Sequence, residues 1–288
     1  MKLAVIVHVF YADLWPEIAD CLRNVDVPFD LFVTFQDEAT VAAARADFPS
    51  ARFVRVENRG FDIAPFLSVL DALDPSAYTH VLKLHTKRDV SVPVGFNGRE
   101  VAGPEWRNWL LSFVRTPERW AASRARIEGD GSVGMIAAAE CILDRRATEG
   151  KEERRAYDAA VCEAARRFGV PASALRGASF VGGTMFLSRM DALALLRGKF
   201  APADFAAADD RHLTNSFAHV AERLIGFAVC ASGRCIESPD GDLARRRCAF
   251  RVRQFRNALM DFLYQNKVTS RGYRMIKVLR IMIWHRKI

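Results

Sequence analysis

The chain has 288 residues, of which 50% are hydrophobic and 26% charged, a composition that excludes an intrinsically disordered protein. Its formal charge of +8 is uneven, because residues 245–288 hold 13 basic residues and one acid, whereas residues 1–244 hold 29 basic and 33 acidic ones. This basic tail predicts an acidic partner, with an anionic membrane surface preferred over nucleic acid. The six cysteines show no metal-binding spacing and are expected to be reduced thiols.

Strand-like and helix-like segments alternate along the first ninety residues. The apolar start, "MKLAVIVHVFY", is interrupted at His8, and we interpret it as the first strand of a cytoplasmic domain rather than as a signal peptide. The alternation predicts an α/β fold with a mostly parallel sheet and helices on both faces. Strands are expected at residues 3–10, 29–35, 51–58 and 79–86, and helices at residues 12–25, 37–48 and 62–73.

The pattern is less regular further along the chain. Residues 91–106 are rich in Gly and Pro and predict a loop that acts as a lid. The segment 178–189 is expected to be one strand that contains a glycine pair, where backbone comes close to another group. A further strand is expected at residues 132–139, and helices at residues 106–114, 117–128, 149–168, 190–198 and 213–229.

The tail after residue 243 is predicted to be a separate basic helical segment, so that residues 1–243 form the main domain and residues 244–288 the tail. In "GYRMIKVLRIMIW", cations recur every three residues and fall on one side of a helical wheel. A basic amphipathic helix ending in Trp is typical of a membrane-surface anchor, although a helix packed on the domain with solvated charges would show the same pattern. The expected membrane contacts are Arg274, Lys277, Arg280 and Trp284.

Polar residues gather where the expected strands end, which is where parallel sheets bind ligands. These residues are His8, Thr34, Asn58-Arg59-Gly60 and His85-Thr86-Lys87. In "ENRGFDIAPFL", Gly60 allows a tight turn, and Asp62 is placed either to cap the following helix or to contact a ligand.

This order of elements resembles the nucleotide-diphospho-sugar transferases of the glycosyltransferase A type, which have a Rossmann-like fold. In many of them the next strand ends in Asp-x-Asp, which holds a metal on the diphosphate. Here His85-Thr86-Lys87 takes that place, so Lys87, Arg88 and a donor imidazole are expected to supply the positive charge. The alternative is that Lys87 and Arg88 are solvated and that His85 is structural. No histidines lie at a ligand spacing, so no protein-bound metal and no required cofactor are predicted.

The chain also resembles the rhamnan synthesis protein F family. The resemblance extends from "VHVFYADLWPEI", with His8, Tyr11 and Trp15, through "NRGFDIAPF", "LKLHTK", "EWRNWLL" and "FVGGTMF" to "HVAERL". It implies a glycosyltransferase that moves a sugar such as rhamnose from a nucleotide-sugar donor to a cell-surface polysaccharide or lipid-linked glycan. Such an enzyme is expected at the inner face of the bacterial cell membrane, without a nucleic-acid partner.

The resemblance also implies roles for individual residues. Donor nucleotide and diphosphate binding fall to His8, Asn58, Arg59, Gly60, Asp62, His85, Thr86 and Lys87, and the sugar or acceptor pocket to Gly182, Gly183 and Thr184. Glu222 is the expected catalytic base, with His219 one turn earlier orienting it or the acceptor. Two alternatives stay open: Glu222 paired to an Arg in an ordinary amphipathic helix, and a non-catalytic scaffold in a polysaccharide-synthesis complex.

Overall fold

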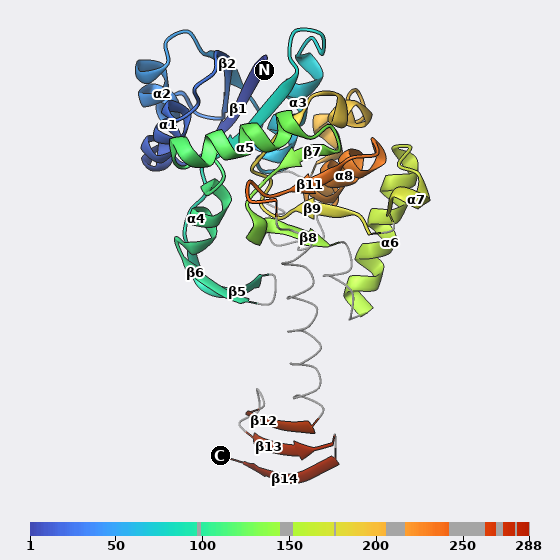
Figure 1. The fold of residues 1–288 in the computed structure, drawn as a ribbon. Helices are drawn as coiled ribbons and strands as arrows, with labels where there is room; N and C mark the ends of the chain where they lie inside the picture. Colours follow the sequence, from blue (N-terminus) through green and yellow to red (C-terminus); the bar gives the residue numbers. More distant parts are fainter. Residues whose placement is uncertain are drawn as a thin grey trace. The chain divides into compact units, whose positions relative to one another are not determined.

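The computed structural model describes residues 1–96, 99–144, 152–175, 177–205, 217–241, 263–268, 273–279 and 281–287. The chain divides into two compact units, Met1–Gly241 and Asp242–Ile288, here called the core unit and the tail unit. Figure 1 shows the central sheet of the core unit with helices packed around it.

A seven-stranded sheet forms the centre of the core unit, in the order β11-β7-β10-β4-β1-β2-β3. Strands β4, β1, β2 and β3 are mutually parallel, β11 is parallel to β7, and β10 is antiparallel to both of its neighbours. The mostly parallel α/β sheet predicted from the alternating segments is therefore confirmed. The strands are β1 (Leu3–Val9), β2 (Phe29–Phe35), β3 (Arg52–Arg55), β4 (His80–His85), β7 (Val133–Ile136), β10 (Phe186–Arg189) and β11 (Cys235–Glu237).

Helices cover both faces of this sheet. On one face, Phe66 of α3 packs edge-on against Phe186 of β10, with ring centroids 5.6 Å apart. On the other face, the Arg189 guanidinium donates a hydrogen bond to the carbonyl of Ile127 in α5. The helices are α1 (Trp15–Arg23), α2 (Ala42–Asp47), α3 (Ile63–Ala72), α4 (Glu105–Leu111), α5 (Pro117–Gly129), α6 (Glu152–Arg167), α7 (Ala172–Leu175) and α8 (Phe217–Ala231).

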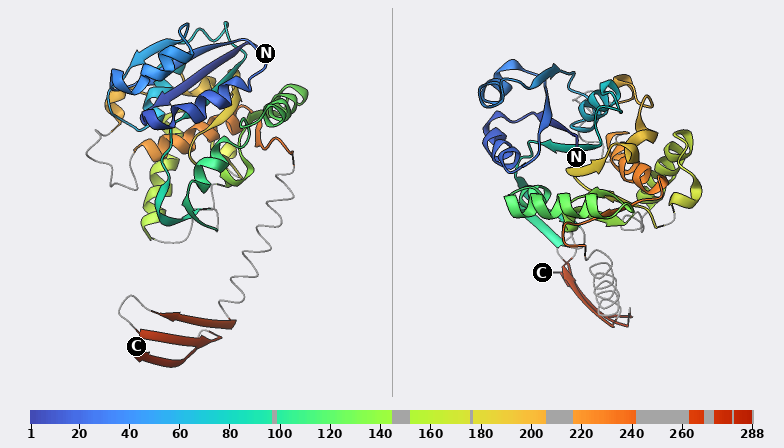
Figure 2. Two further views of the ribbon diagram at one scale, coloured as in Figure 1. Left: turned by 90° about the vertical axis from the view of Figure 1, so that its left-hand side faces the viewer. Right: turned by 45° about the horizontal axis from the view of Figure 1, so that its top comes forward.

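Two segments of the core unit differ from their predicted structure. Residues 91–106, expected to be a loop, contain the antiparallel hairpin of β5 (Val90–Phe96) and β6 (Arg99–Gly103), which lies beside α4 (Figure 2). An isolated two-stranded hairpin tolerates Pro93, because a strand with only one neighbour needs fewer backbone donors.

The expected single strand at residues 178–189 is two strands in different sheets. β9 (Ser179–Val181) pairs with β8 (Ile142–Asp144), and β10 joins the central sheet. The intervening turn contains Gly183 at φ +85° and Thr184 at φ +51°, conformations that no extended strand can include. The glycine pair therefore marks a break between strands.

The tail unit is not helical where the amphipathic helix was predicted. It forms a three-stranded antiparallel sheet of β12 (Tyr264–Val268), β13 (Tyr273–Val278) and β14 (Ile281–Lys287). The segment is rich in β-branched residues, which favour strands and outweigh the three-residue spacing of its cations. Arg280 and residues 242–262 lie outside the described residues. In the described part of the chain, no helix is long and apolar enough to cross a membrane.

Candidate functional site

Buried polar side chains line one face of three adjacent strands beneath the start of α3. His8 of β1 is in register with Thr34 of β2 and with His85 of β4, so these side chains share a face of the parallel sheet. Lys83 lies two residues before His85 and therefore on the same face. All four side chains are buried. Burying polar side chains costs free energy unless they form hydrogen bonds, so these groups must be satisfied by one another or by a ligand.

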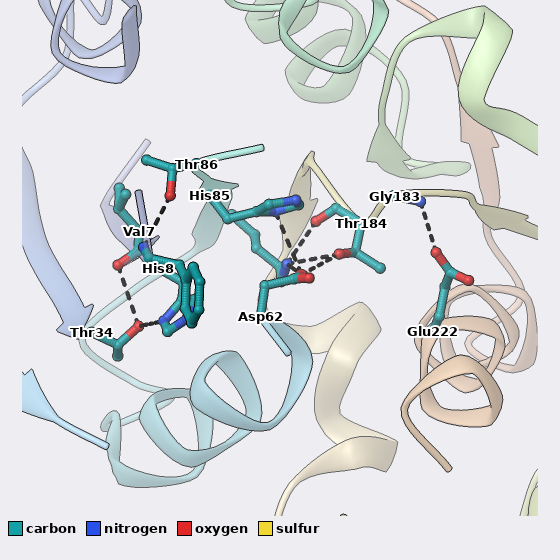
Figure 3. A network of polar contacts seen from close by, with 11 residues as sticks. Val7, His8, Thr34, Asp62, His85, Thr86, Gly183, Thr184 and Glu222 are labelled. Atoms are coloured by element: carbon teal, nitrogen blue, oxygen red, sulfur yellow. Dashed lines mark hydrogen bonds and ion pairs between the residues drawn. The ribbon is translucent and has the colours of Figure 1, made fainter. Parts of the chain in front are cut away.

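Lys83 is the buried cation of this strip, and its side chain is only 1% exposed. Its Nζ donates to Asp62 Oδ2 at 2.5 Å, to Thr184 Oγ1 at 2.8 Å and to the Thr184 carbonyl at 2.9 Å. The Thr184 hydroxyl also donates to Asp62 Oδ2 at 2.5 Å, so that strand β4, the start of α3 and the turn before β10 meet at one carboxylate oxygen (Figure 3).

The backbone before α3 is shaped to aim Asp62 at Lys83. Gly60 and Phe61 both have positive φ, at +61° and +55°, and a Cβ at Gly60 would lie 2.5 Å from the Phe205 ring. Asp62 occupies the N-cap position of α3, but its side chain makes no capping hydrogen bond. The capping interpretation is therefore wrong, because the carboxylate faces the buried ammonium instead.

Asp62 and Lys83 have the geometry of an ion pair, with Lys83 Nζ 2.5 Å from Asp62 Oδ2. Burial favours the neutral acid, but the charges and hydrogen bonds of the neighbouring groups outweigh it and hold the pKa of Asp62 below its usual range. Burial lowers the pKa of Lys83, and the adjacent Asp62 carboxylate partly offsets that effect. Breaking one partner of such a pair leaves an uncompensated buried charge, which makes this cluster a strong constraint on the local fold.

His85 is a neutral imidazole beside this pair. Burial lowers its pKa to about 3, although Asp62 acts in the opposite direction. Its Nδ1 lies 3.4 Å from Asp62 Oδ2 and has no hydrogen-bond partner among the described residues. The expectation that His85 contributes positive charge to a diphosphate is not supported by this environment, because at neutral pH it can only donate or accept a hydrogen bond.

His8 is also neutral, with burial lowering its pKa to about 4. The Thr34 hydroxyl donates to the Val7 carbonyl at 3.4 Å, so its oxygen accepts a hydrogen bond from His8 Nδ1 at 2.9 Å. This pattern leaves His8 Nε2 as an acceptor. Thr86 has a different role, since its hydroxyl accepts the backbone N–H groups of Phe10 and Tyr11 at 3.0 Å and fixes the turn after β1.

Lys87 carries the one cation of the "LKLHTK" stretch that is not committed to an acid. Its Nζ lies 4.7 Å from the centre of the Trp106 ring, and no carboxylate in the described part of the chain forms an ion pair with it. The neighbouring cations differ: Arg88 pairs with Asp13, and Arg107 with Glu17 and Asp89.

Glu222 lies on α8, across the Gly183-Thr184 turn from Asp62 (Figure 3). Its Oε1 accepts the Gly183 N–H at 2.7 Å, and its Oε2 is 3.9 Å from Arg223. Burial raises the pKa of Glu222, while the Gly183 N–H, Arg223 and Lys87 act to lower it. His219 lies one turn earlier on α8, with its ring centre 6.0 Å from that of Phe61, and burial lowers its pKa.

The structure brings some predicted site residues together and separates others. Asp62, His85 and Thr184 meet at one point, and Glu222 meets Gly183. Asn58 instead accepts a hydrogen bond from Gln36, and Arg59 is held by Glu57 and the Phe205 carbonyl. Gly182 donates to the Cys141 carbonyl. Through these contacts Asn58, Arg59 and Gly182 stabilise the local fold. A ligand-binding role for these three residues remains a prediction.

Lys83 is the central residue that sequence reasoning missed. A lysine in the middle of the apolar run "HVLKLH" signals a buried ammonium, which requires a carboxylate partner. In the described part of the chain, no group of three or more His, Cys, Asp or Glu side chains is arranged to hold a metal ion. A metal-independent site remains a prediction.

Comparison with known proteins gives the family. The family model described as rhamnan synthesis protein F matches residues 1–234. Proteins described as uncharacterized protein WxcX, from two strains of Xanthomonas campestris pv. campestris, are 28% and 27% identical over 246 residues. Each alignment covers 83% of this chain and 33% of the relative, so the chain spans about a third of the length of these curated relatives. With a match over most of its length, the chain belongs to the rhamnan synthesis protein F family, which implies involvement in polysaccharide synthesis.

Proposed function

We propose that this chain is a glycosyltransferase that moves a sugar, such as rhamnose, from a nucleotide-diphosphate donor to a growing polysaccharide or lipid-linked glycan. The family supports the polysaccharide context. The observation that carries the reaction type is a cation with no ion pair among the described residues, Lys87, within electrostatic reach of a buried carboxylate, Glu222. Lys87 and Glu222 are close enough for each charge to affect the other, since Lys87 lowers the pKa of Glu222.

Lys87 is the group we assign to the leaving diphosphate. Negative charge grows on the diphosphate as its bond to the sugar breaks, and a cation that is not neutralised by an acid stabilises that charge. The Trp106 ring holds the ammonium without neutralising it. His85 takes part as a neutral hydrogen-bonding group, because its burial keeps it uncharged.

Glu222 is the group we assign as general base. The acceptor hydroxyl oxygen forms a bond to the anomeric carbon, the carbon–diphosphate bond breaks, and the hydroxyl proton passes to Glu222. Burial raises the pKa of this carboxyl, which strengthens it as a proton acceptor near neutral pH. The Gly183 N–H at 2.7 Å fixes one oxygen and leaves the other for the acceptor.

A thermal-shift screen tests the donor site. Nucleoside diphosphates and their sugar derivatives are added to the full chain, with Mg²⁺ or with a chelator, and a ligand that binds only the native state raises the melting temperature. We expect a shift that survives chelation and is lost in Lys87→Ala but kept in Arg88→Ala. Arg88 is a matched control because it is the next residue and is neutralised by Asp13. A shift that requires metal, or that is equal in both variants, would contradict the assignment.

A non-catalytic scaffold is the second candidate, and one observation favours it. Asp62, expected to meet the nucleotide, already accepts hydrogen bonds from Lys83 and Thr184 at Oδ2. A sheet that keeps this cluster for stability alone could bind partners without turning over a donor. Release of nucleotide from a sugar donor separates the two functions, because a scaffold releases none with any donor while the thermal shift remains.

We also propose that the tail unit binds an anionic membrane surface, through a sheet rather than a helix. Cross-strand register places Tyr264, Val278 and Ile281 in one row, with Ile276 opposite Trp284 on the same face. Tyr264, Ile281 and Trp284 are 50%, 67% and 42% exposed. The described residues of this unit include no Asp or Glu. Exposed aromatic and aliphatic groups together with unbalanced cations suit an interface with anionic lipid.

Vesicle sedimentation tests the membrane proposal. The full chain should sediment with phosphatidylglycerol vesicles but not with phosphatidylcholine vesicles, and Trp284→Ala should weaken that binding. Phe61→Ala is the matched control, since Phe61 is an aromatic residue of the core unit with the same 42% exposure. Equal binding to both kinds of vesicle, or equal loss in both variants, would refute the proposal.

A further inference from the structure

We infer that Lys83 is a positioning residue that sets the carboxylate of Glu222 through the turn of Gly183 and Thr184. The inference rests on the proposed function only in that Glu222 is taken to be the catalytic base. The two residues do not touch in the structure. They are joined through the backbone of the turn: the Lys83 ammonium donates hydrogen bonds to Thr184, and the N–H of the preceding residue, Gly183, donates to Glu222 Oε1.

The ammonium of Lys83 has no capacity left for a ligand. A lysine ammonium has three N–H donors, and here the acceptors are Asp62 Oδ2, the Thr184 hydroxyl and the Thr184 carbonyl. It also lies 5.5 Å from the centre of the Phe66 ring, which covers its remaining side. A group this saturated cannot bind a diphosphate, so its role must be exerted through the residues that it holds.

Thr184 is the residue that needs to be held. A threonine at φ +51° is strained, because its branched side chain disfavours the left-handed region. The Lys83 ammonium donates hydrogen bonds to both the carbonyl and the hydroxyl of Thr184, and Asp62 accepts a hydrogen bond from that hydroxyl. These contacts fix the Thr184 carbonyl and side chain, and the Thr184 N–H donates to the Val181 carbonyl at 3.2 Å, so the turn is held at both ends of this residue.

The locked turn aims the Gly183 N–H at Glu222. Gly183 is itself left-handed at φ +85°, and a Cβ there would lie 2.7 Å from Leu110. Gly183 is therefore confined between the α4 side chains and the gripped Thr184. Its N–H donates to Glu222 Oε1 at 2.7 Å. If Thr184 were released, the Gly183 N–H would turn away from Glu222. The Glu222 carboxylate would then lose a hydrogen bond that stabilises its ionised form.

The groups that face Glu222 come from several elements. Arg223 and His219 lie on its own helix, Lys87 follows β4, and Asp62 precedes α3. Lys83 is electrostatically coupled to Glu222 as well, since Glu222 acts to raise the pKa of Lys83. A variant at Lys83 therefore changes both the field and the hydrogen bonds. A variant at Thr184 changes the hydrogen bonds while both charges remain.

The test is a ¹³C NMR titration of the Glu222 carboxyl in the full chain, with Glu222→Gln identifying the signal by removing it. We expect Lys83→Met and Thr184→Val to raise the pKa of Glu222, with about a tenfold change in its protonation equilibrium, the effect of one hydrogen bond to a charged group. Thr184→Ser keeps the hydroxyl and should restore the parent value.

The control is Ser188→Ala, which removes a buried hydroxyl hydrogen bond to the Gly134 carbonyl elsewhere on the same sheet. It should leave the Glu222 titration unchanged. A shift in Lys83→Met alone would mean coupling through space and would overturn the relay, as would an equal shift in Ser188→Ala. Because the titration needs no turnover, its result stands even if no donor is ever found, and nucleotide release reports separately on the proposed function.

Discussion

The two lysines of "LKLHTK" are four residues apart but should have different roles, Lys83 in stability and Lys87 in binding the donor. Lys83→Met keeps the apolar stem against Phe66 and removes the ammonium, so Asp62 is left as an uncompensated buried charge. Losing one partner of a buried pair costs about 3–5 kcal/mol, and the 18% exposure of the Asp62 side chain favours the lower end, about 3 kcal/mol. For a unit of this size, that loss lowers the melting temperature by about 6–12 °C.

Lys87→Ala removes a partly exposed cation that has no ion pair among the described residues. It loses a contact with Trp106 that is worth about 0.5–1 kcal/mol, so its melting temperature should fall by no more than about 4 °C. Scanning calorimetry of both variants, with and without a nucleoside diphosphate, separates the effects. Stable Lys83→Met, or a Lys87→Ala variant as destabilised as Lys83→Met, would refute the division of roles.

Three further outcomes follow from the buried groups. Burial raises the pKa of Glu222, so its contribution to stability is present in acid and is lost as the pH rises through its folded-state pKa. The melting temperature of Glu222→Gln, compared with that of the parent chain at the same pH, should therefore be higher at about pH 8 than at about pH 5. The same variant should lose sugar transfer. Gly183→Ala should lower the free energy of unfolding by about 1–3 kcal/mol in a denaturant titration, because its Cβ meets Leu110 in a left-handed conformation. His8 has its pKa lowered to about 4 by burial, so the parent chain should lose about 3 kcal/mol from this residue as the pH falls from about 6.5 to 4, and His8→Asn should reduce that slope in acid-unfolding curves.

The sequence was sufficient for the parallel half of the sheet, because local patterns decide those elements. Strands β1 to β4 alternate with helices at short spacing, and β1, β2 and β4 lie close to their predicted bounds, whereas β3 (Arg52–Arg55) is shorter than the predicted strand at residues 51–58. The edge where polar residues gather also follows from this alternation, since parallel strands end at one side. The period of a strand also places Lys83 and His85 on one face, whereas the register of His8 with Thr34 and His85 comes from the structure.

The tail was predicted wrongly because two periods fit one segment. Cations at every third position satisfy a helical wheel, yet the same stretch carries Ile276, Val278, Ile281 and Ile283, which favour strands. A short amphipathic pattern cannot decide between these when no capping residue fixes a helix start. The excess of positive charge and the exposed apolar side chains are the same whether the segment is a helix or a sheet. The membrane proposal rests on these two features alone.

Lys83 was overlooked for a different reason, which concerns how polar motifs are weighed. His85 and Lys87 were predicted to bind a ligand because they lie at the end of the strand, where parallel sheets bind ligands. Lys83 lies inside the strand, where a charge is costly unless an acid meets it, so its presence already implies a tertiary partner. That partner, Asp62, stood in the "NRGFD" turn and was assigned to a ligand instead. A lysine within an apolar strand and an acid at the start of the preceding helix should be weighed first as a structural pair. Lys87, which has no ion pair within the described part of the chain, is then the stronger candidate for chemistry.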